Sequence, residues 1–420
     1  KRKHFRIPGN NVSTTQTLIG GSKMFSVLLE LPEFEVVKQE IYPTHYLVHV
    51  KKNSDQERCT YCGFHSSIVH DRRTRKVRDL SVLNKPLYLM VHIKRYQCQN
   101  CGEVFSTHFE SIASHQHFTN RFREFIYEQV LGTTIQEISR KYKIAYSTVE
   151  RIFYSVADQK ANEQKLLIQE IQEDQEITLS LDEVAVRKGH KYETVLYDAN
   201  LGAVMGMYKD RDYESTLELL SLKVLHPEQV KNVVLDMWDP FHKAIRKAFP
   251  KAHIIVDKYH VVQKVTQALD KVRKKIPGLK RSRFHLLKSY ENVKEKHRPK
   301  LNEMLETHDD LAYAYFLKEL FRDFYKSTDY VKADLLLTEW IQLAWASPFP
   351  SFHEVVRTIE NWRHQILQYF KTPYTNGRSE GTNHKIKNIK RRAYGYRNLH
   401  RFRTRVFLEC TGKTYKQQLL

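Results

Sequence analysis

Hydrophobic and polar residues alternate along two stretches of the first hundred residues, 44–51 and 87–97, and this pattern predicts β-strands. Between 115 and 160 the apolar positions recur every three or four residues instead, which is typical of amphipathic helices. The first third of the chain is therefore expected to pass from a strand-rich region into a helical one.

Strand-like and helix-like runs then alternate up to residue 260. Strands are expected over 177–186, 191–199 and 203–209 as an antiparallel meander, followed by a helix over 213–223, a strand ending at Asp236, a helix over 240–249 and a strand over 252–257. The stretch 258–370 is helical in pattern and too long for a simple connection, so it reads as an all-helical insertion. Aromatic residues such as Tyr313, Phe316, Phe321 and Phe324 are expected in its core, with a stacking platform for DNA ends as the alternative.

Composition narrows the class of partner. The chain has 420 residues, enough for two to four domains at about 150 residues each. It carries 69 Lys and Arg against 48 Asp and Glu, a net charge of +21, which suggests a nucleic acid or an anionic membrane surface. No apolar run reaches the ~18 residues of a membrane span, and no basic helix has a clean apolar face, so nucleic acid is favoured. Residues 1–23 read as an extension or linker, with Met24 as a hypothetical natural start.

Four of the five cysteines form two matching pairs, Cys59-Thr-Tyr-Cys62-Gly and Cys98-Gln-Asn-Cys101-Gly. Each pair would aim two thiolates at one centre, and four sulfurs would complete a structural zinc site of the zinc-ribbon type. Buried thiol pairs or redox pairs are the alternatives, but the βαβ context of redox pairs is absent. The nearby histidines (His65, His108, His115 and His117) are expected at the surface, and Cys410 in the core.

Residues 133–153 have the pattern of a helix-turn-helix. Ile135, Ile138 and Tyr142 share one helical face, and Ser147 with Glu150 is a capping-box signature for a second, recognition helix. The candidates for DNA contact are Tyr146, Thr148 and Arg151. Two short helices of an ordinary bundle would give the same pattern.

Acidic residues stand in or after apolar strands. Asp182 lies within Ile-Thr-Leu-Ser-Leu-Asp-Glu-Val, Asp236 ends a second strand, and Asp257 ends a third. Glu380 lies at the start of a very basic helix. It is one of only two acidic residues after residue 370. Paired carboxylates suit two Mg²⁺ ions in phosphodiester chemistry, although a single Asp at a strand end is more often a cap or turn former.

The last 50 residues hold 13 Lys or Arg and two acids. The candidates for phosphate contact are Arg378, Lys385, Lys387, Lys390, Arg391 and Arg392. A solvated helix face is the alternative, but such faces usually mix charges of both signs.

At this point the motifs S-L-D-E-V-A-V, V-V-L-D-M-W-D-P-F, V-D-K-Y-H-V-V and N-G-R-S-E-G-T-N-H-K-I-K-N-I-K-R-R resemble those of bacterial insertion-sequence transposases of the ISL3 family, over about residues 24–415. The resemblance implies a DDE transposase with an RNase H-like core and the catalytic triad Asp182, Asp236 and Glu380. Asp257 and His260 resemble a supporting D-x-x-H element. The resemblance also implies two Mg²⁺ or Mn²⁺ ions per active site, and at least a homodimer to join two element ends.

The expected fold is α+β and multidomain. Its segments are an extension (1–23), a zinc-ribbon domain (24–110), a helix-turn-helix domain (111–172), an RNase H-like catalytic core (173–260), a helical insertion (261–370) and the final basic helices of the core (371–420). The expected function is cut-and-paste transposition in the bacterial cytoplasm, acting on terminal inverted repeats and target DNA. The alternatives are a non-catalytic DNA-binding regulator with a degenerate core, and a nuclease without strand transfer.

Overall fold

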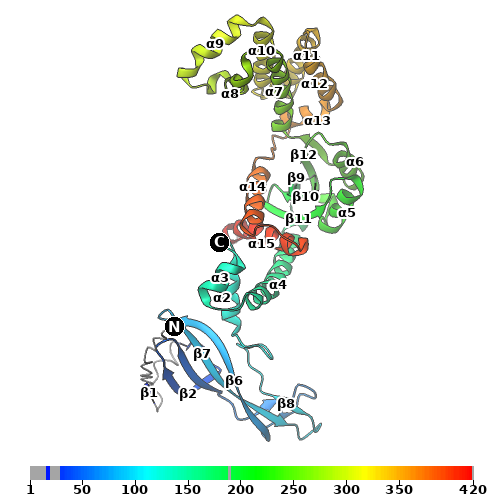
Figure 1. The fold of residues 1–420 in the computed structure, drawn as a ribbon. Coiled ribbons are helices and arrows are strands. Elements are labelled where there is room, and N and C mark those ends of the chain that lie inside the picture. Colours follow the sequence, from blue (N-terminus) through cyan, green and yellow to red (C-terminus); the bar gives the residue numbers. More distant parts are fainter. Residues whose placement is uncertain (1–15, 19–28, 188–190, 419–420) are drawn as a thin grey trace, which may run out of the picture. The chain divides into compact units, whose positions relative to one another are not determined.

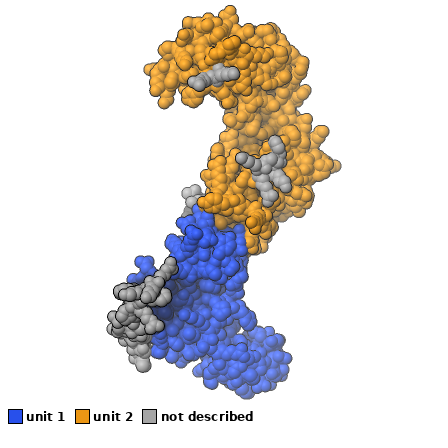
Figure 2. Space-filling view, in the orientation of Figure 1, with its two compact units in different colours: residues 1–157 blue, residues 158–420 orange. Residues whose placement is uncertain are grey.

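The computed structural model describes residues 16–18, 29–187 and 191–418, and it divides into two compact units, residues 1–157 and 158–420 (Figures 1 and 2). The division falls inside helix α4 (Tyr146–Glu173). Most of the expected extension, with Met24, lies outside the described residues, but Gln16–Leu18 forms strand β1. No helix in the described ranges combines the length and apolar composition needed to cross a bilayer.

The first unit is built on a mixed sheet of strand order β1-β2-β3-β7-β6, with β8 added to β7. Besides β1, this sheet contains β2 (Phe34–Ile41), β3 (Tyr46–Lys52), β6 (Val69–Val82), β7 (Lys85–Gln97) and β8 (Val104–Ser106). Strands β4 (Glu57–Arg58) and β5 (His65–Ser66) pair with each other in a separate two-stranded sheet. Alternate residues of β3, β6 and β7 form its core, including Val48, Val50, Val77, Leu89 and Val91. The zinc-ribbon pattern therefore occupies one end of a larger β-domain.

Three helices follow the sheet: α2 (Asn120–Val130), α3 (Ile135–Tyr142) and α4. Thr119 caps α2 by accepting a hydrogen bond from the backbone N–H of Phe122, and it donates to the buried Asp79 of β6 at 2.7 Å. Arg121 also donates to Asp79 through Nε at 2.9 Å. A buried carboxylate is stable only when it is paired and hydrogen-bonded, so this network fixes α2 against the sheet.

The second unit contains a five-stranded sheet of order β11-β10-β9-β12-β13. Strands β9 (Ile177–Arg187), β10 (Lys191–Asp198) and β11 (Ala203–Lys209) are antiparallel, while β12 (Val230–Leu235) and β13 (His253–Val256) run parallel to β9. The meander and the two added strands match the sheet expected for an RNase H-like core. Figure 1 shows α5 (Tyr213–Lys223) and α6 (Asp239–Ala248) on one side of this sheet.

Helices α14 (Gly377–Arg392) and α15 (Leu399–Gln418) lie on the other side of the sheet. Ile386 and Ile389 of α14 and Phe402 and Val406 of α15 pack into one cluster with strand residues such as Val184. Cys410 packs against this cluster, as expected for a small core residue.

An all-helical region separates β13 from α14, as the sequence predicts. Its helices are α7 (Lys258–Lys275), α8 (Arg283–Leu287), α9 (Arg298–Thr307), α10 (Asp309–Phe324), α11 (Tyr330–Ala346), α12 (Pro350–Asn361) and α13 (Arg363–Leu367). Phe321 and Phe324 are fully buried beside Trp340, which confirms the core interpretation for those two residues. Phe316 is instead 47% exposed, so its expected core position is wrong: it lies on the solvent face of α10.

Candidate active site and metal centres

The two cysteine pairs fold into two knuckles of the same geometry. In the first, the backbone N–H of Gly63 donates to the carbonyl of Cys59 at 2.9 Å, and in the second Gly102 donates to Cys98 at 3.0 Å. Both glycines have left-handed backbones, with φ of 78° and 76°, which a side chain would strain. The sequence pattern Cys-x-x-Cys-Gly is therefore the direct cause of the turn.

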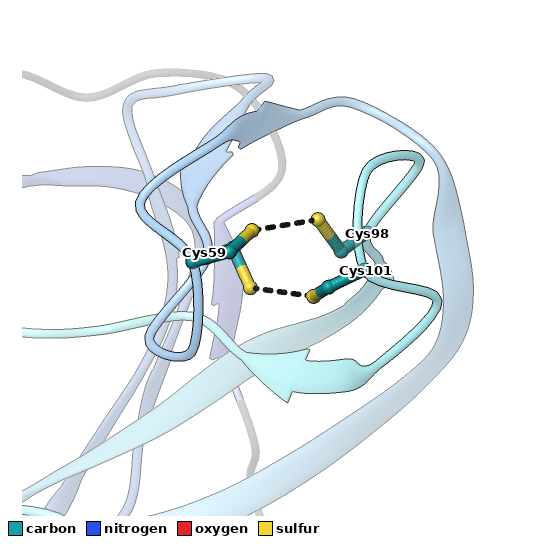
Figure 3. Close-up of side chains that lie close together, drawn as sticks. Cys59, Cys98 and Cys101 are labelled. Atoms are coloured by element: carbon teal, nitrogen blue, oxygen red, sulfur yellow. Dashed lines mark hydrogen bonds between the residues drawn. The ribbon is translucent and has the colours of Figure 1, made fainter.

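The four sulfurs converge on one point. The Sγ atoms of Cys59 and Cys101 lie 3.7 Å apart, those of Cys62 and Cys98 lie 3.5 Å apart, and all four lie within 4.8 Å of one another (Figure 3). Sulfurs about 2.3 Å from a tetrahedral zinc ion lie about 3.8 Å from one another, so the cluster fits this ion closely. The cluster is consistent with a structural zinc site. The four nearby histidines are exposed and outside it.

The helix-turn-helix consists of α3, a tight turn and the first part of α4. Thr134 caps α3 by accepting a hydrogen bond from Glu137, and Lys143 turns the chain in a left-handed conformation with φ of 52°. The expected cap at Ser147 is wrong: α4 already begins at Tyr146, and the carbonyl of Ala145 accepts from Thr148 and Val149. A capping-box pattern inside a helix is thus only a spacing coincidence.

The three expected DNA-contact residues of this motif have different exposures. Tyr146 and Arg151 are exposed, whereas Thr148 is half-buried in the first turn of α4. Val149 and Ile152 point into the core on the opposite face.

Three strands bring acids to one edge of the second sheet. Val234 of β12 pairs with Ser180 of β9, so Asp236 and Asp182, two residues further along each strand, lie level on neighbouring strands. Asp257 follows β13, which is parallel to β12. Asp236 and Asp257 follow the carboxyl ends of two parallel strands, which share one edge of the sheet, and the strand register places Asp182, in the middle of β9, level with Asp236.

A histidine completes this acidic cluster. His260, in the first turn of α7, has its Nε2 2.9 Å from Oδ1 of Asp236 and 4.0 Å from Oδ2 of Asp257. The ligand atoms of Asp236, Asp257 and His260 all lie within 4.8 Å of one another. Asp182 and Glu380 are not members of this tight group, although their charges act on it.

The cluster has the electrostatics of a cation site. Burial, together with the negative charge of Asp236, raises the pKa of Asp182 to about 6. Burial also raises the pKa of Asp257, helped by the charges of Asp236 and Glu380. Although burial alone would lower the pKa of His260, the hydrogen bond and charge of Asp236 raise it overall. Crowded carboxylates of this kind lack positive charge, which a divalent cation can supply.

Helix α14 docks along β9 through one face. Ser180 donates to Asn376 Oδ1 at 2.7 Å, Asn383 Nδ2 donates to Asp182 Oδ2 at 2.5 Å, and Val184 packs with Ile386 and Ile389 further along. Sequence reasoning assigned Asn383 no role. Its signal was the spacing of residues 376, 379, 383 and 386, which is one helical face.

Glu380 lies in the first turn of α14, one position away from this docking face. It lines a cavity of about 610 Å³ together with Asp257, Lys258 and Tyr259. Asp236 and His260 line a neighbouring cavity of about 230 Å³ with Arg211 and Trp238.

Some of the basic residues expected to hold phosphate already have protein partners. Arg392 is paired with Glu409 at 2.6 Å, and Lys385 donates to the carbonyl of Glu409. Lys390 donates to the carbonyl of Ala185 at 3.1 Å, and Arg378 to that of Ala199 at 3.4 Å.

Lys387 and Arg391 are exposed and have no side-chain partner among the described residues. They are the expected contacts that remain free for DNA.

Fold and site define a DNA-processing protein of the DDE transposase class, and comparison with known families gives the same result. The model for the DDE domain of family ISL3, described as "Transposase", matches residues 179–406. The models for the zinc-finger of transposase IS204/IS1001/IS1096/IS1165 and for the helix-turn-helix domain of transposase family ISL3 match residues 55–101 and 107–157. The chain belongs to the ISL3 family of insertion-sequence transposases.

Two relatives illustrate the range of similarity. The chain is 26% identical over 368 residues to the transposase for insertion sequence element IS1001 of Bordetella parapertussis, covering 84% of this chain and 89% of the relative. It is 27% identical over 254 residues to the transposase for insertion sequence element IS1557 of Mycobacterium tuberculosis, covering 52% and 57%. Membership of the family implies DNA binding and transposase activity for the chain.

Proposed function

We propose that this transposase cuts and joins DNA at the edge of the second sheet, with Asp182, Asp236 and Glu380 as the catalytic acids. The observation that carries the proposal is the level placement of Asp182 and Asp236 on adjacent strands, beside Asp257 and His260. Glu380 shares a cavity with Asp257, which supports its inclusion.

The side chains present fit divalent cations. The donors are carboxylate oxygens, the ligands that Mg²⁺ and Mn²⁺ prefer. Oδ2 of Asp257 is buried and has no hydrogen-bond partner among the described residues, as expected of an atom that faces a cation. Asp182, Asp236 and Glu380 would hold two such ions, with Asp257 and His260 in support. Two bound ions stabilise the charge on the attacking and leaving oxygens of a phosphodiester.

The residues of the chain then act in two steps. In the first, a water attacks a phosphodiester at the element end, and the bond from phosphorus to the 3′-oxygen of the element breaks, which leaves a 3′-hydroxyl and a 5′-phosphate. In the second, this 3′-hydroxyl attacks a phosphodiester of target DNA, and the new ester bond forms as the 3′-oxygen of the target strand leaves as a hydroxyl. His260 lies against Asp236, with its Nε2 2.9 Å from Oδ1, and thereby orients that carboxylate. Lys387 and Arg391 hold the DNA backbone, and Tyr146 and Arg151 contact the terminal repeats.

The remaining parts of the proposal concern assembly. The ion in the cysteine cluster is zinc, held for structure alone, because four sulfurs leave no open position. Joining two element ends requires two copies of the chain, so the active form is a homodimer. The activity takes place in the bacterial cytoplasm, because the element DNA lies there.

The direct test uses the full chain, a duplex carrying the ends of its own element, and Mg²⁺. Asp182→Asn, Asp236→Asn and Glu380→Gln should each abolish cut products while leaving duplex binding intact. Asp239→Asn is the matched control, because Asp239 is exposed three residues beyond Asp236. A triad variant that cuts as well as the unchanged protein would remove that residue from the site.

The same reaction separates the two rival functions. A DNA-binding regulator would give no metal-dependent cut product, and a simple nuclease would give cut ends without joined products. Detection of joined target DNA favours the transposase.

A further inference from the structure

The first unit carries a charged sheet face that neither the helix-turn-helix nor the catalytic site uses. The inner face of β3, β6 and β7 is apolar and buried, with Val50, Val77 and Val91 in the core. Side chains of the intervening residues point the other way, because successive residues of a strand alternate between faces. We define the basic sheet face by Lys38, Lys51, Arg72, Lys76, His92 and Lys94 of this outer side.

Strand register places these side chains next to one another. Arg72 pairs with Lys94 across β6 and β7, and Lys51 of β3 pairs with His92 of β7. Like charges directly opposite each other destabilise a sheet. The repulsion between Arg72 and Lys94 therefore destabilises the free sheet, and a bound polyanion would reduce this repulsion.

The positive charges are only partly neutralised within the protein. Lys51 pairs with Glu35 at 3.1 Å and Lys94 with the fully exposed Asp55 at 3.1 Å, and exposed pairs of this kind contribute little. Lys38 pairs with Glu40. Arg72 and Lys76 are exposed and have no carboxylate partner in the described part of the chain. The face thus offers net positive charge to a partner.

Its shape and setting favour duplex DNA. A groove of about 400 Å³ runs along the face, lined by Lys51, Arg72, Thr74, His92 and Lys94. At the other end of β6, the buried Arg78 lies 5.1 Å from the ring of Phe122 in α2, the helix that precedes the helix-turn-helix. A row of cations along a groove attracts a polyanion such as a DNA duplex.

We propose that the basic sheet face is a second DNA-binding surface, which contacts the phosphate backbone beside the sequence that the helix-turn-helix binds, without reading bases. The surface binds duplex DNA of any sequence, and its contribution weakens with salt because each phosphate contact releases condensed cations. It does not depend on the catalytic assignments above.

The test measures the affinity of the full chain for a labelled duplex of unrelated sequence over a range of salt concentrations. The double variant Arg72→Ala/Lys76→Ala should weaken binding about tenfold and reduce the slope of log affinity against log salt by about two. Lys251→Ala/Lys332→Ala is the matched control, since both lysines are exposed in the second unit. The charge-preserving double variant Arg72→Lys/Lys76→Arg should retain the original slope.

The proposal would be overturned by an unchanged slope in the alanine variant, by an equal loss in the control variant, or by a loss confined to element-end duplexes. Loss of binding to single-stranded RNA or to anionic vesicles, with duplex binding unchanged, would also overturn it. An unchanged melting temperature and zinc content establish that the variants are folded. Asp182→Asn should keep the original slope, so failure at the catalytic site remains distinguishable.

Discussion

The side-chain amide of Asn383 donates a hydrogen bond of 2.5 Å to Oδ2 of Asp182, joining the first turns of α14 to the middle of β9. The other oxygen of Asp182 accepts from the backbone N–H of Glu183 at 2.7 Å. Both oxygens of this acid are therefore oriented by the protein. An orientation fixed in this way matters for a carboxylate that must face a cation.

Asn383→Ala should lower DNA cleavage by about 10- to 100-fold, the usual effect of removing a residue that orients a metal ligand. Duplex binding should stay unchanged, because Asn383 is buried and faces the sheet. Cleavage rates measured over a range of Mg²⁺ concentrations provide the check, with Asn388→Ala, exposed on the same helix, as the control. Equal rates for the two variants would show that the hydrogen bond has no positioning role.

The carboxylate of Asp182 should also reduce the stability of the metal-free protein. Its folded pKa of about 6 lies above its ordinary value of 3.8, so the unfolded chain releases the proton first as the pH rises. Asp182→Asn should therefore raise the free energy of unfolding by on the order of 1–2 kcal/mol above pH 6. The gain should vanish below about pH 4, where both states are protonated.

Denaturant titrations of both proteins at several pH values, in the presence of a chelator, measure this difference. A variant that is less stable than the unchanged protein at neutral pH would contradict the raised pKa.

Removal of the metal from the cysteine cluster should unfold only one end of the first sheet. Cys59 and Cys98 form a small cluster with Tyr96 and Phe105, separate from the main core of the sheet. Cys59→Ser or Cys98→Ser should abolish zinc binding, because the site then lacks one of its four thiolates. Metal analysis and circular dichroism test this, with Cys410→Ser retaining zinc as the control. Full zinc content in Cys59→Ser would exclude the four-cysteine site.

The buried ion pair between Asp79 and Arg121 should contribute strongly to stability. Asp79 is fully buried, and Asp79→Ala would leave Arg121 and Thr119 without their acceptor. We expect a loss of about 2–4 kcal/mol, somewhat reduced because Arg121 can turn toward water. Glu163→Ala, which removes an exposed pair with Lys160, should cost less than about 0.5 kcal/mol. Comparable losses in the two variants would show that burial does not decide the effect.

Local pattern predicted many of the elements correctly. The helix expected over 213–223 and the strands expected over 177–186 and 203–209 agree with α5, β9 and β11 to within a residue. These segments have clear periodicity, and their backbones follow it because each buries one face. The expected cap at Ser147 failed because a capping box needs only a spacing, whereas the start of α4 was decided by the turn at Lys143.

In the candidate site too, the sequence indicated the kinds of residue, whereas the tertiary structure decided which of them lie together. Residue type and position relative to strands pointed to Asp182, Asp236 and Glu380 as a triad, and their catalytic roles stay predictions. Which side chains lie closest together was decided by the parallel pairing of β12 with β13, which places Asp257 and His260 beside Asp236. Glu380 instead faces the cavity near Asp257, because residues 376 and 383 of the same helix are bound to β9.

By itself, the sequence determined the order of elements, the knuckle turns and the kinds of ligand available, since these depend on neighbouring residues. Only the tertiary structure decided that Arg392 is paired with Glu409, that Asn383 orients Asp182, and that Arg72 lies opposite Lys94. Each of these contacts joins residues on different elements, and strand register and helix docking are set by the packing of whole faces, which no local pattern records.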